Sequence, residues 1–447
     1  MVNFGRKHKG FMKLILGMGL TGLSVARFFS SNNVDYRIAD SRLSPPMQDI
    51  CIKENLLSDC HLGEWKESLL ENITEVVISP GIAETESIVG WARLQKIPVI
   101  SDIELFGRYT KAPIVGITGS NGKSTVTQLL GEMAIGSGKN AVICGNIGKP
   151  VMESLSDEAE LYVVEMSSYQ LDYTNNLSLL TGVVTNISPD HLDRYPNYDI
   201  YIASKLKLYE YCQYSVVNLN EPLVKGIKGD SCYAIEEATQ SCEFSAKKVG
   251  GVYTIYQGKN ILMTSDDLIV VGRHNVENML SALTLGRQAG LSVQEMTQVA
   301  KSFTGLPHRL EWVTNLSGVD YFNNSKSTNA ISTITAIEAL SDRYKSIVLI
   351  AGGIAKKEDY SKLFQLISEK INAVILIGES ATLFSQQING CPVSIVESMK
   401  QAVVSSKAIA KKGAILLSPG CASFDMFVDF NERGEVFKRH VLEKNQN

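Results

Sequence analysis

The sequence predicts an α/β protein built from three domains, and three observations support this expectation. The chain has 447 residues, about three times the roughly 150 residues that one domain usually contains. Short apolar runs suited to buried strands alternate along it with helical patterns, which favours parallel, doubly wound sheets. Two glycine-rich turns, at residues 17–22 and 118–125, each separate such a strand from a helix. We therefore expect a Rossmann-like N-terminal sheet, a central domain like a P-loop ATPase and a Rossmann-like C-terminal domain.

The N-terminal domain is expected over residues 1–107. KLILG at residues 13–17 reads as its first strand, followed by a glycine turn and a helical pattern. Further short apolar runs, ending at polar or glycine residues, lie at residues 36–40, 75–83 and 97–106. Residues 1–11 are expected to form a flexible extension, because Met12 can itself begin the domain.

The central domain is expected over residues 108–305 and the C-terminal domain over residues 306–447. Strand-like runs near the start of the central domain give way, between about residues 226 and 271, to short alternating β patterns. The helical pattern HNVENMLSALTLGRQAG closes this domain. In the C-terminal domain, YKSIVLIAGGIA, INAVILIG and KKGAILLSPG read as buried parallel strands that lead into helices.

The composition excludes several classes of protein. Lys plus Arg number 43 and Asp plus Glu 47, a formal net charge of −4, so no basic excess indicates a nucleic-acid partner. The apolar stretches fall short of the ~18 residues that span a bilayer. Arg6, Lys7 and Lys9 precede an apolar run as in a signal peptide, but glycines interrupt that run. Eight irregularly spaced cysteines are best explained as reduced thiols, so we expect a cytoplasmic protein.

The first glycine motif, GMGLTG at residues 17–22, stands between a strand and a helix, and Asp40 ends the next strand. Such glycines permit a tight turn and let a diphosphate approach the amides at a helix N-terminus. NAD, FAD and a nucleotide sugar fit this motif equally well, because all of them carry a diphosphate. The alternative is a tight strand-to-helix turn with no ligand.

The second glycine motif, TGSNGKST at residues 118–125, predicts an ATP or GTP site. Backbone amides of such a loop cradle phosphates, its lysine reaches the β- and γ-phosphates, and a hydroxyl ligates Mg²⁺. The motif misses the strict Walker pattern by one residue, since position 117 is Ile and the glycine falls at 116.

Acidic residues follow two strands beyond this loop. Glu165 ends the run LYVVE, and Asp190-His191-Leu192-Asp193 follows GVVTNIS. At the same sheet edge as a phosphate loop, both are candidate Mg²⁺ positions, although DHLD alone is more often helix capping. Taken individually, Lys205 reads as a solvated lysine, and Arg309 and the loop NNSKSTN at residues 323–329 read as polar loop residues.

Together and in this order, these segments resemble the Mur ligases, which add amino acids to the muramoyl peptide precursor of bacterial cell walls. The resemblance rests on TGSNGKST, EMSS, DHLDRYP, the HN and N of HNVEN, PHR and NNSKSTN. GMGLTGLS, SPGI, DIELF, TGLPHR and SPGCASFDMF are similar to the branch of the family that adds D-glutamate. The similarity extends from Lys13 to Phe437.

This resemblance implies an ATP-dependent ligase that adds D-glutamate to UDP-N-acetylmuramoyl-L-alanine through an acyl phosphate. ATP and two Mg²⁺ ions are the implied cofactors, and the implied state is a cytoplasmic monomer with small-molecule partners only. The residues implied to bind the UDP substrate are Gly19, Leu20, Thr21, Asp40, Ser41, Arg42, Ser79, Gly81, Asn146, Ser167 and His191.

The resemblance also implies an ATP site, metal ligands and an amino-acid site. The ATP residues are Gly119, Ser120, Asn121, Gly122, Lys123, Ser124, Thr125, Asn275, Asn278, Arg309, Asn324, Lys326 and Thr328. The metal ligands are Ser124, Glu165, His191 and Lys205, the last as N6-carboxylysine. The residues implied to bind D-glutamate are Lys356, Ser423 and Phe430. The residues implied to be catalytic are Lys123, Glu165, His191, Lys205 and Lys326.

Two departures from the family pattern concern the C-terminal domain. Asn324 stands where many members have Asp, and Ile354 follows the paired glycines Gly352 and Gly353 where an acid is common. The competing interpretations are a sibling or folylpolyglutamate-type ligase, an NAD-dependent dehydrogenase, and a nucleotide-binding protein without ligase activity.

Overall fold

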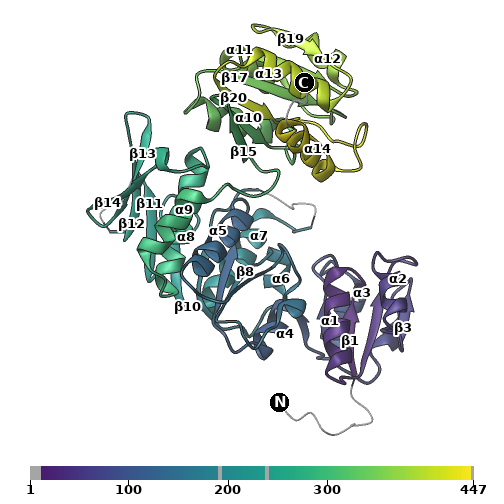
Figure 1. Ribbon diagram of the computed structural model, residues 1–447. Helices are drawn as coiled ribbons and strands as arrows, with labels where there is room; N and C mark the ends of the chain where they lie inside the picture. Colours follow the sequence, from purple (N-terminus) through teal and green to yellow (C-terminus); the bar gives the residue numbers. More distant parts are fainter. Residues whose placement is uncertain (1–11, 190–193, 237–240, 444–447) are drawn as a thin grey trace. The chain divides into compact units, whose positions relative to one another are not determined.

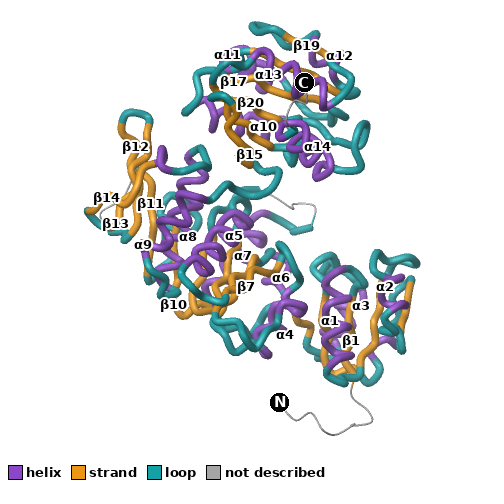
Figure 2. The backbone as a smooth tube through the Cα atoms, viewed as in Figure 1, coloured by secondary structure: helices purple, strands orange, loops and turns teal. Residues whose placement is uncertain are grey.

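The computed structural model describes residues 12–189, 194–236 and 241–443 (Figure 1). The chain divides into two compact units. The first contains the chain through Ala246, together with Tyr256–Asn260 and Asn278–Thr297. The second contains Lys247–Ile255, Ile261–Glu277 and the chain from Gln298 onward. Strands and helices alternate along most of the chain (Figure 2), as the sequence pattern predicts.

The N-terminal sheet has five strands in the order β3-β2-β1-β4-β5, and every pair in it is parallel. In its central strand Leu14, Ile15 and Leu16 are at most 1% exposed, as expected for a strand covered on both faces. Its elements are β1 (Met12–Leu16), α1 (Leu20–Ser31), β2 (Tyr36–Asp40), α2 (Gln48–Lys53), β3 (Cys60–Leu62), η1 (Glu67–Leu70), β4 (Ile73–Ile78), α3 (Ser87–Leu94), β5 (Val99–Ser101) and α4 (Asp102–Tyr109).

The apolar run at residues 97–106 is a strand followed directly by a helix. Strand β5 ends at Ser101, and α4 begins at Asp102. The Ser101 hydroxyl accepts a hydrogen bond from the backbone N–H of Glu104 at 3.1 Å, which caps the helix. The polar pair Ser-Asp therefore ends the strand within a run that periodicity alone leaves continuous.

The central sheet has nine strands in the order β14-β13-β12-β11-β10-β9-β6-β8-β7. The strands from β12 to β7 pair in parallel. Its elements are β6 (Ile114–Thr118), α5 (Lys123–Gly136), β7 (Ala141–Gly145), η2 (Val151–Ser154), β8 (Leu161–Glu165), α6 (Ser168–Asp172), β9 (Leu179–Val184), α7 (Tyr198–Leu206), η3 (Lys207–Tyr211), β10 (Cys212–Asn218), β11 (Ser231–Ile235), β12 (Phe244–Val249), β13 (Val252–Gln257), β14 (Asn260–Thr264), η4 (Ser265–Asp267), α8 (Arg273–Gln288) and α9 (Val293–Ser302).

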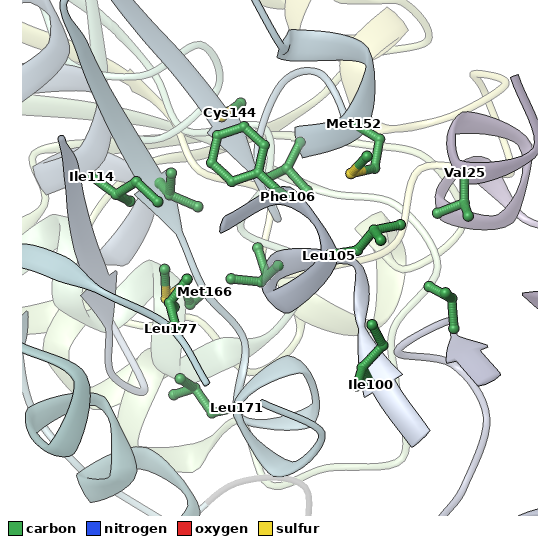
Figure 3. Close-up of a cluster of buried hydrophobic side chains, with 14 of the residues drawn as sticks. Val25, Ile100, Leu105, Phe106, Ile114, Cys144, Met152, Met166, Leu171 and Leu177 are labelled. Atoms are coloured by element: carbon green, nitrogen blue, oxygen red, sulfur yellow. The ribbon is translucent and has the colours of Figure 1, made fainter. Parts of the chain in front are cut away.

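A hydrophobic cluster in the first unit includes the apolar side of helix α4. Figure 3 shows Leu105 and Phe106 among its members, together with Cys144 and Met152. The Phe106 ring meets the Tyr162 ring edge to face, with centroids 4.9 Å apart, a geometry that adds about 0.5–1.5 kcal/mol to simple burial. This packing fixes α4 and, with it, Asp102 at its first position.

The C-terminal sheet has six strands in the order β15-β16-β20-β17-β18-β19, all parallel except the β15–β16 pair. Along β17 the side chains of Val348 and Ile350 join one apolar cluster and that of Leu349 joins another, so both faces of the sheet are covered. The elements are β15 (Glu311–Leu316), β16 (Val319–Asn323), α10 (Ala330–Ser341), β17 (Ile347–Gly352), α11 (Ser361–Lys370), β18 (Ala373–Ile377), α12 (Ala381–Ser385), β19 (Val393–Ile395), α13 (Met399–Ile409), β20 (Gly413–Leu417) and α14 (Phe430–Leu442).

The cysteines differ in part from the expectation of reduced thiols. Cys232 and Cys242 form a disulfide across ten positions of sequence, which corrects the expectation for this pair. The other six cysteines are free thiols. Across the described parts of the chain, no helix is long and apolar enough to cross a membrane.

Candidate active site

The phosphate loop lies between the end of β6 and the start of α5, and its conformation requires glycine at two positions. Gly119 has φ +145° and Gly122 has φ +81°. A Cβ atom on Gly119 would lie 2.0 Å from Thr185 Oγ1, and one on Gly122 would lie 2.4 Å from Asn278 Oδ1. The loop is thus packed closely against its neighbours, in a backbone conformation that L side chains rarely adopt.

The segment that follows β9 holds the loop in place. The Ser120 hydroxyl donates to the Ser188 carbonyl at 3.0 Å, and the Ser188 N–H donates back to the hydroxyl at 3.0 Å. The Asn121 N–H donates to Asn186 Oδ1 at 2.9 Å, and the Thr185 hydroxyl donates to the Asn121 carbonyl at 2.7 Å. These bonds fix the backbone before any nucleotide binds, so the loop is preorganised for phosphate.

Two lysines converge on this loop. Lys123 Nζ donates to the carbonyls of Gly119 at 2.9 Å and Ser120 at 3.0 Å. Lys205, on α7, donates from Nζ to the same Gly119 carbonyl at 2.8 Å. Lys205 is only 2% exposed, so the interpretation of this residue as a solvated lysine was wrong. Its Nζ also lies 4.7 Å from the centroid of the Tyr201 ring.

Glu165 ends β8 with a carboxylate that is only partly satisfied. The residue is 2% exposed, and Oε1 accepts a hydrogen bond from Asn146 Nδ2 at 2.9 Å. Oε2 is buried and has no hydrogen-bond partner within the described part of the chain. An unpaired buried carboxylate oxygen is costly unless a cation meets it, and hard oxygen ligands suit Mg²⁺. The Glu165 carboxylate therefore suits the implied metal as one of its ligands.

The other implied metal ligands are described less fully than Glu165. His191 lies outside the described residues, and Ser124 lies in the first turn of α5, directly after Lys123. Among the residues that are described, no group of three or more His, Cys, Asp and Glu side chains is arranged to hold a metal. The structure thus places Glu165 and Lys205 by their contacts and leaves the His191 prediction open.

Buried hydrogen bonds between side chains support the segment after Glu165. Ser167 caps α6 and forms a capping box with Gln170, and Gln170 Nε2 donates to Asp102 Oδ1 at 3.0 Å. Burial raises the pKa of Asp102 to about 6, although the hydrogen bond from Gln170 opposes the shift. Asp102 and Gln170 were not among the predicted site residues, and the DIELF segment that begins at Asp102 entered only as part of the family resemblance.

A pocket of about 480 Å³ lies at the carboxyl ends of β1, β2 and β4 in the N-terminal sheet. Parallel sheets bind ligands at this edge, and the volume lies in the usual range for small-molecule sites. Eight residues predicted for the UDP substrate line it: Gly19, Leu20, Thr21, Asp40, Ser41, Arg42, Ser79 and Gly81. Trp65 and Glu86, which the sequence did not suggest, also line it.

Asp40 organises one side of this pocket. Its Oδ2 accepts from the Met18 N–H at 2.7 Å and from the Arg42 guanidinium at 2.7 Å, and its Oδ1 accepts from the Arg42 N–H at 2.9 Å. Burial by itself would raise the pKa of Asp40, but these hydrogen bonds outweigh it and hold the pKa below its ordinary value. The carboxylate therefore ties the glycine turn to the end of β2.

The predicted residues of the second unit form a group around the loop after β16. Lys326 Nζ lies 5.2 Å from the centroid of the Phe430 ring, and Lys356 Nζ donates to Thr328 Oγ1 at 3.4 Å. Ser423 is 2% exposed. The structure thus brings together residues assigned from the family pattern to ATP and to D-glutamate.

Arg433, which the sequence did not suggest, connects two segments of this group. Its guanidinium is 1% exposed and donates to the carbonyls of Ser325 at 2.7 Å and Cys421 at 3.0 Å, and to the Ser325 hydroxyl at 3.0 Å. Burial lowers the pKa of Arg433 to about 10. Three neutral acceptors hold this cation between the loops that carry Lys326 and Ser423.

The two departures from the family pattern have structural roles. Asn324 Oδ1 accepts from the Leu310 N–H at 3.0 Å, and Nδ2 donates to the Ser418 hydroxyl at 3.0 Å. Ile354 exchanges backbone hydrogen bonds with Ala422, both at 3.0 Å. The Asn324 amide thus serves as both acceptor and donor, which an ionised Asp cannot do.

Three further predicted ATP residues have described surroundings. Asn278 lies beside Gly122, as its distance from a Cβ at that glycine shows. Asn275 donates to the Val271 carbonyl at 2.8 Å. Arg309 stands between His308 and Leu310, which have φ values of +62° and +48°; such left-handed residues hold a tight turn.

The chain matches three family models: the Mur ligase MurD-like N-terminal domain over residues 12–101, the Mur ligase middle domain over 117–286 and the Mur ligase glutamate ligase domain over 308–421. A relative in Marinobacter nauticus, named UDP-N-acetylmuramoylalanine–D-glutamate ligase, is 40% identical, covering 96% of this chain and 97% of its own length. A protein of the same name in Nitrosococcus oceani is 39% identical, covering 96% of each chain.

Solved structures show the same architecture at low sequence identity. The crystal structure of UDP-N-acetylmuramate-alanine ligase from Thermotoga maritima has a TM-score of 0.58 and 15% identity to this chain. The match covers 96% of this chain and 99% of that one. At this identity the likeness concerns the fold alone, and it agrees with the three α/β sheets described above.

Proposed function

This chain belongs to the Mur ligase family, and from that premise we propose that it joins D-glutamate to UDP-N-acetylmuramoyl-L-alanine in an ATP-dependent step of peptidoglycan precursor synthesis. The observation that carries the proposal is the similarity to two relatives of that printed name over 96% of the chain. A different Mur-type or folylpolyglutamate-type ligase is the second candidate. The match of residues 12–101 to the MurD-like N-terminal domain favours the first.

The sugar nucleotide binds, in this proposal, to the pocket at the edge of the N-terminal sheet. Gly19, Leu20 and Thr21 lie where the chain enters α1, so their amides face a diphosphate at a helix N-terminus. Gly22 packs so closely that a Cβ there would lie 1.8 Å from the Gly17 carbonyl oxygen. The turn therefore admits only glycine at position 22, which keeps the helix start close to the ligand.

ATP binds to the phosphate loop of the central domain. The Lys123 ammonium donates hydrogen bonds to carbonyls of its own loop. When a nucleotide binds, its phosphate oxygens would replace these carbonyls as the acceptors. Phosphoryl transfer is promoted mainly by positioning and charge stabilisation, so a rigid loop that carries a cation suits the reaction. Lys326 and Arg309, from the second unit, are the further cations that we assign to the nucleotide.

Mg²⁺ is the implied metal, and the residues present fit it. Glu165 Oε2 is the buried carboxylate oxygen without a partner in the described structure, and Ser124 supplies the hydroxyl that phosphate loops give to the ion. When bound, the ion neutralises charge that develops on the transferred phosphoryl group. We propose His191 and a carboxylated Lys205 as the remaining ligands, with two ions in total.

The reaction proceeds in two displacements. An oxygen of the substrate's L-alanine carboxylate attacks the γ-phosphorus of ATP, forming an acyl phosphate and releasing ADP. The amine of D-glutamate, as the free base, attacks the acyl carbon. The tetrahedral intermediate loses one proton from nitrogen to the departing phosphate or to water and expels inorganic phosphate, which leaves the amide. Lys123 and Lys326 offset negative charge on the phosphoryl group during the first displacement.

D-Glutamate binds in the C-terminal domain in this proposal. Lys356 presents an ammonium suited to a carboxylate, and it lies beside Thr328. Ser423 is buried and lies two positions after Cys421, whose carbonyl accepts a hydrogen bond from Arg433. Phe430 begins α14 and lies against Lys326. These contacts support an amino-acid site close to the cation that acts on the phosphate.

Carboxylation of Lys205 is a separate proposal. Addition of CO₂ to the neutral amine, with loss of a proton, replaces a cation by a carboxylate. The Lys205 ammonium lies within 2.8 Å of the Gly119 carbonyl, so the new carboxylate would lie at the phosphate loop, where a metal ligand is needed. This supports Lys205, once carboxylated, as a residue that would hold Mg²⁺.

The test is phosphate release from the purified protein with ATP, Mg²⁺ and UDP-N-acetylmuramoyl-L-alanine, with four amino acids supplied separately. D-Glutamate alone should give phosphate and a product heavier by one glutamate residue. Release with L-lysine, meso-diaminopimelate or L-alanine instead would retain ligase chemistry and overturn the proposed specificity. If no phosphate is released with any of the four amino acids, the proposed substrate is overturned.

The proposal also covers the domain boundaries, the cellular location and the oligomeric state. We place domain boundaries near residues 107 and 305, which the separate family matches ending at 101 and beginning at 308 support. We propose a cytoplasmic location, because nucleotide sugars and ATP are cytoplasmic substrates, and we propose a monomer as the state that the family resemblance implies.

A further inference from the structure

The sugar-nucleotide pocket contains a pair of side chains that no motif predicts, Trp65 and Glu86. They are 21 positions apart in sequence, and the Trp65 indole N–H donates to Glu86 Oε2 at 2.8 Å. Both line the pocket with the glycine turn and Asp40. The pair therefore adds an aromatic ring and a carboxylate to the pocket lining, in addition to the Asp40–Arg42 pair.

Trp65 connects the apolar core of the domain to the pocket. It lies two positions after Gly63, whose φ is +94°, and it is 8% exposed within the cluster that contains Leu14, Leu16 and Ile78. A buried indole N–H must find an acceptor, and in this protein the acceptor is the Glu86 carboxylate. The bond fixes the ring in one orientation, with part of its surface facing the cavity.

Glu86 holds the other end of the pair. Its backbone carbonyl accepts from the Val89 N–H at 3.0 Å and so begins helix α3. The same residue thus ties three parts of the pocket together: the start of α3, the loop from Ser79 that leads to it, and Trp65. The donor that bonds to the Glu86 carboxylate, the indole N–H, carries no charge. The Asp40 carboxylate, by contrast, pairs with the positively charged Arg42 guanidinium at 2.7 Å.

We propose that Trp65 and Glu86 form a specificity wall for the uridine part of the sugar nucleotide, an inference that rests on the proposed function. The indole offers an apolar surface to an uncharged ring. The Glu86 carboxylate orients the indole and disfavours a phosphate at that end of the pocket, because two anions repel each other. The diphosphate is thereby directed to the glycine turn, where helix amides accept it.

Three variants separate the hydrogen bond from the charge. Glu86→Ala leaves the indole N–H without an acceptor, and Trp65→Phe removes the N–H but keeps a ring. Trp65→Phe should raise the Kd for uridine, UMP and UDP by a similar factor of about five to thirty, because the base loses one oriented contact. Glu86→Ala should raise the Kd for uridine by the same factor but the Kd for UDP by less, because it also removes the negative charge. The double variant should be no weaker than either single variant, since both remove one interaction.

Glu86→Gln keeps an acceptor for the indole and removes the negative charge. It should recover most of the affinity lost in Glu86→Ala, and its preference for UDP over uridine should rise above that of the wild type. The matched control is Glu84→Ala, an exposed glutamate that bonds to Arg93 outside the pocket lining. Thermal unfolding followed by circular dichroism confirms that each variant is folded.

Calorimetric titration with uridine, UMP and UDP is the deciding measurement, together with kcat and KM for the sugar nucleotide. A higher KM at unchanged kcat in Glu86→Ala and Trp65→Phe supports the wall. Unchanged affinity in Glu86→Ala, while the wild type performs the D-glutamate reaction, overturns the wall alone. Loss confined to UDP, or a Gln variant as weak as the Ala variant, also overturns it. A wild type that binds none of the three ligands overturns the proposed function and the wall together.

Discussion

Lys123 and Lys205 donate hydrogen bonds to one acceptor, the carbonyl oxygen of Gly119, at 2.9 and 2.8 Å. They come from the helix after the phosphate loop and from α7, 82 positions later in sequence. Two ammonium groups on one carbonyl repel each other, so a modification that turns one of them into an anion relieves the repulsion. This relationship gives the assigned roles of the two lysines a common geometric basis.

Carboxylation predicts that activity depends on dissolved CO₂. The wild type should lose turnover when CO₂ is stripped from the assay buffer and regain it when bicarbonate is added, because the carbamate forms reversibly. Lys205→Ala should be about a hundredfold slower or worse, the usual cost of one electrostatic group at a phosphoryl-transfer site, and insensitive to bicarbonate. A wild type equally active in both buffers would contradict the proposal.

Gly122→Ala should abolish useful ATP binding. The new Cβ would lie 2.4 Å from Asn278 Oδ1, at a φ of +81°, so kcat/KM for ATP should fall about a hundredfold or more, equivalent to about 3 kcal/mol. Gly138→Ala is the matched control, with a φ of +78° and open space around the added Cβ. If both variants lose ATP binding equally, backbone strain rather than the close contact is responsible.

Glu165→Gln tests the unpaired carboxylate oxygen. The amide keeps an oxygen that can accept from Asn146 but offers no second anionic oxygen, so the metal should bind more weakly. We expect kcat to fall by about two to three orders of magnitude, with a higher half-saturating Mg²⁺ concentration and an unchanged Kd for UDP. An unaltered Mg²⁺ titration would remove Glu165 from the metal site.

Asp102 makes a pH-dependent contribution to stability. Burial raises its pKa from 3.8 to about 6, so the folded state binds more protons than the unfolded state between these values. The free energy of unfolding should therefore fall as pH rises from about 4 to about 6, by on the order of 3 kcal/mol from this group. In urea unfolding, the difference between wild type and Asp102→Asn should change over this window and stay constant above it. A difference that is independent of pH would contradict the assignment.

Arg433 should influence D-glutamate binding without touching the ligand. Lysine cannot reach three acceptors on two segments, so Arg433→Lys should raise KM for D-glutamate about tenfold and lower the free energy of unfolding by about 2–4 kcal/mol. KM for the sugar nucleotide should stay the same. Arg439→Lys, exposed on the same helix, serves as control. An equal rise in both KM values would indicate a general structural role.

The local sequence predicted those features that depend on short-range chemistry. The glycine turns at residues 17–22 and 118–125 were identified because only glycine permits the positive φ and close approach found at Gly122. The strands were found because both faces of a parallel sheet are covered, which leaves short apolar runs such as β17. Even so, the run at residues 97–106 contains a strand and a helix, since the Ser101 cap is a local bond that apolar periodicity does not reveal.

The tertiary structure decided which distant residues meet. Sequence physics reads Lys205 as solvated, yet α7 places it at 2% exposure against Gly119. The contacts Asn146–Glu165, Gln170–Asp102, Trp65–Glu86 and Arg433–Cys421 likewise join positions whose spacing carries no signal. A polar side chain acquires its role from the partner that strand order and helix packing bring to it, whereas a turn acquires its shape from its own residues. The sequence by itself therefore determined the loops that we propose to bind phosphate, and the fold determined the side chains that orient them.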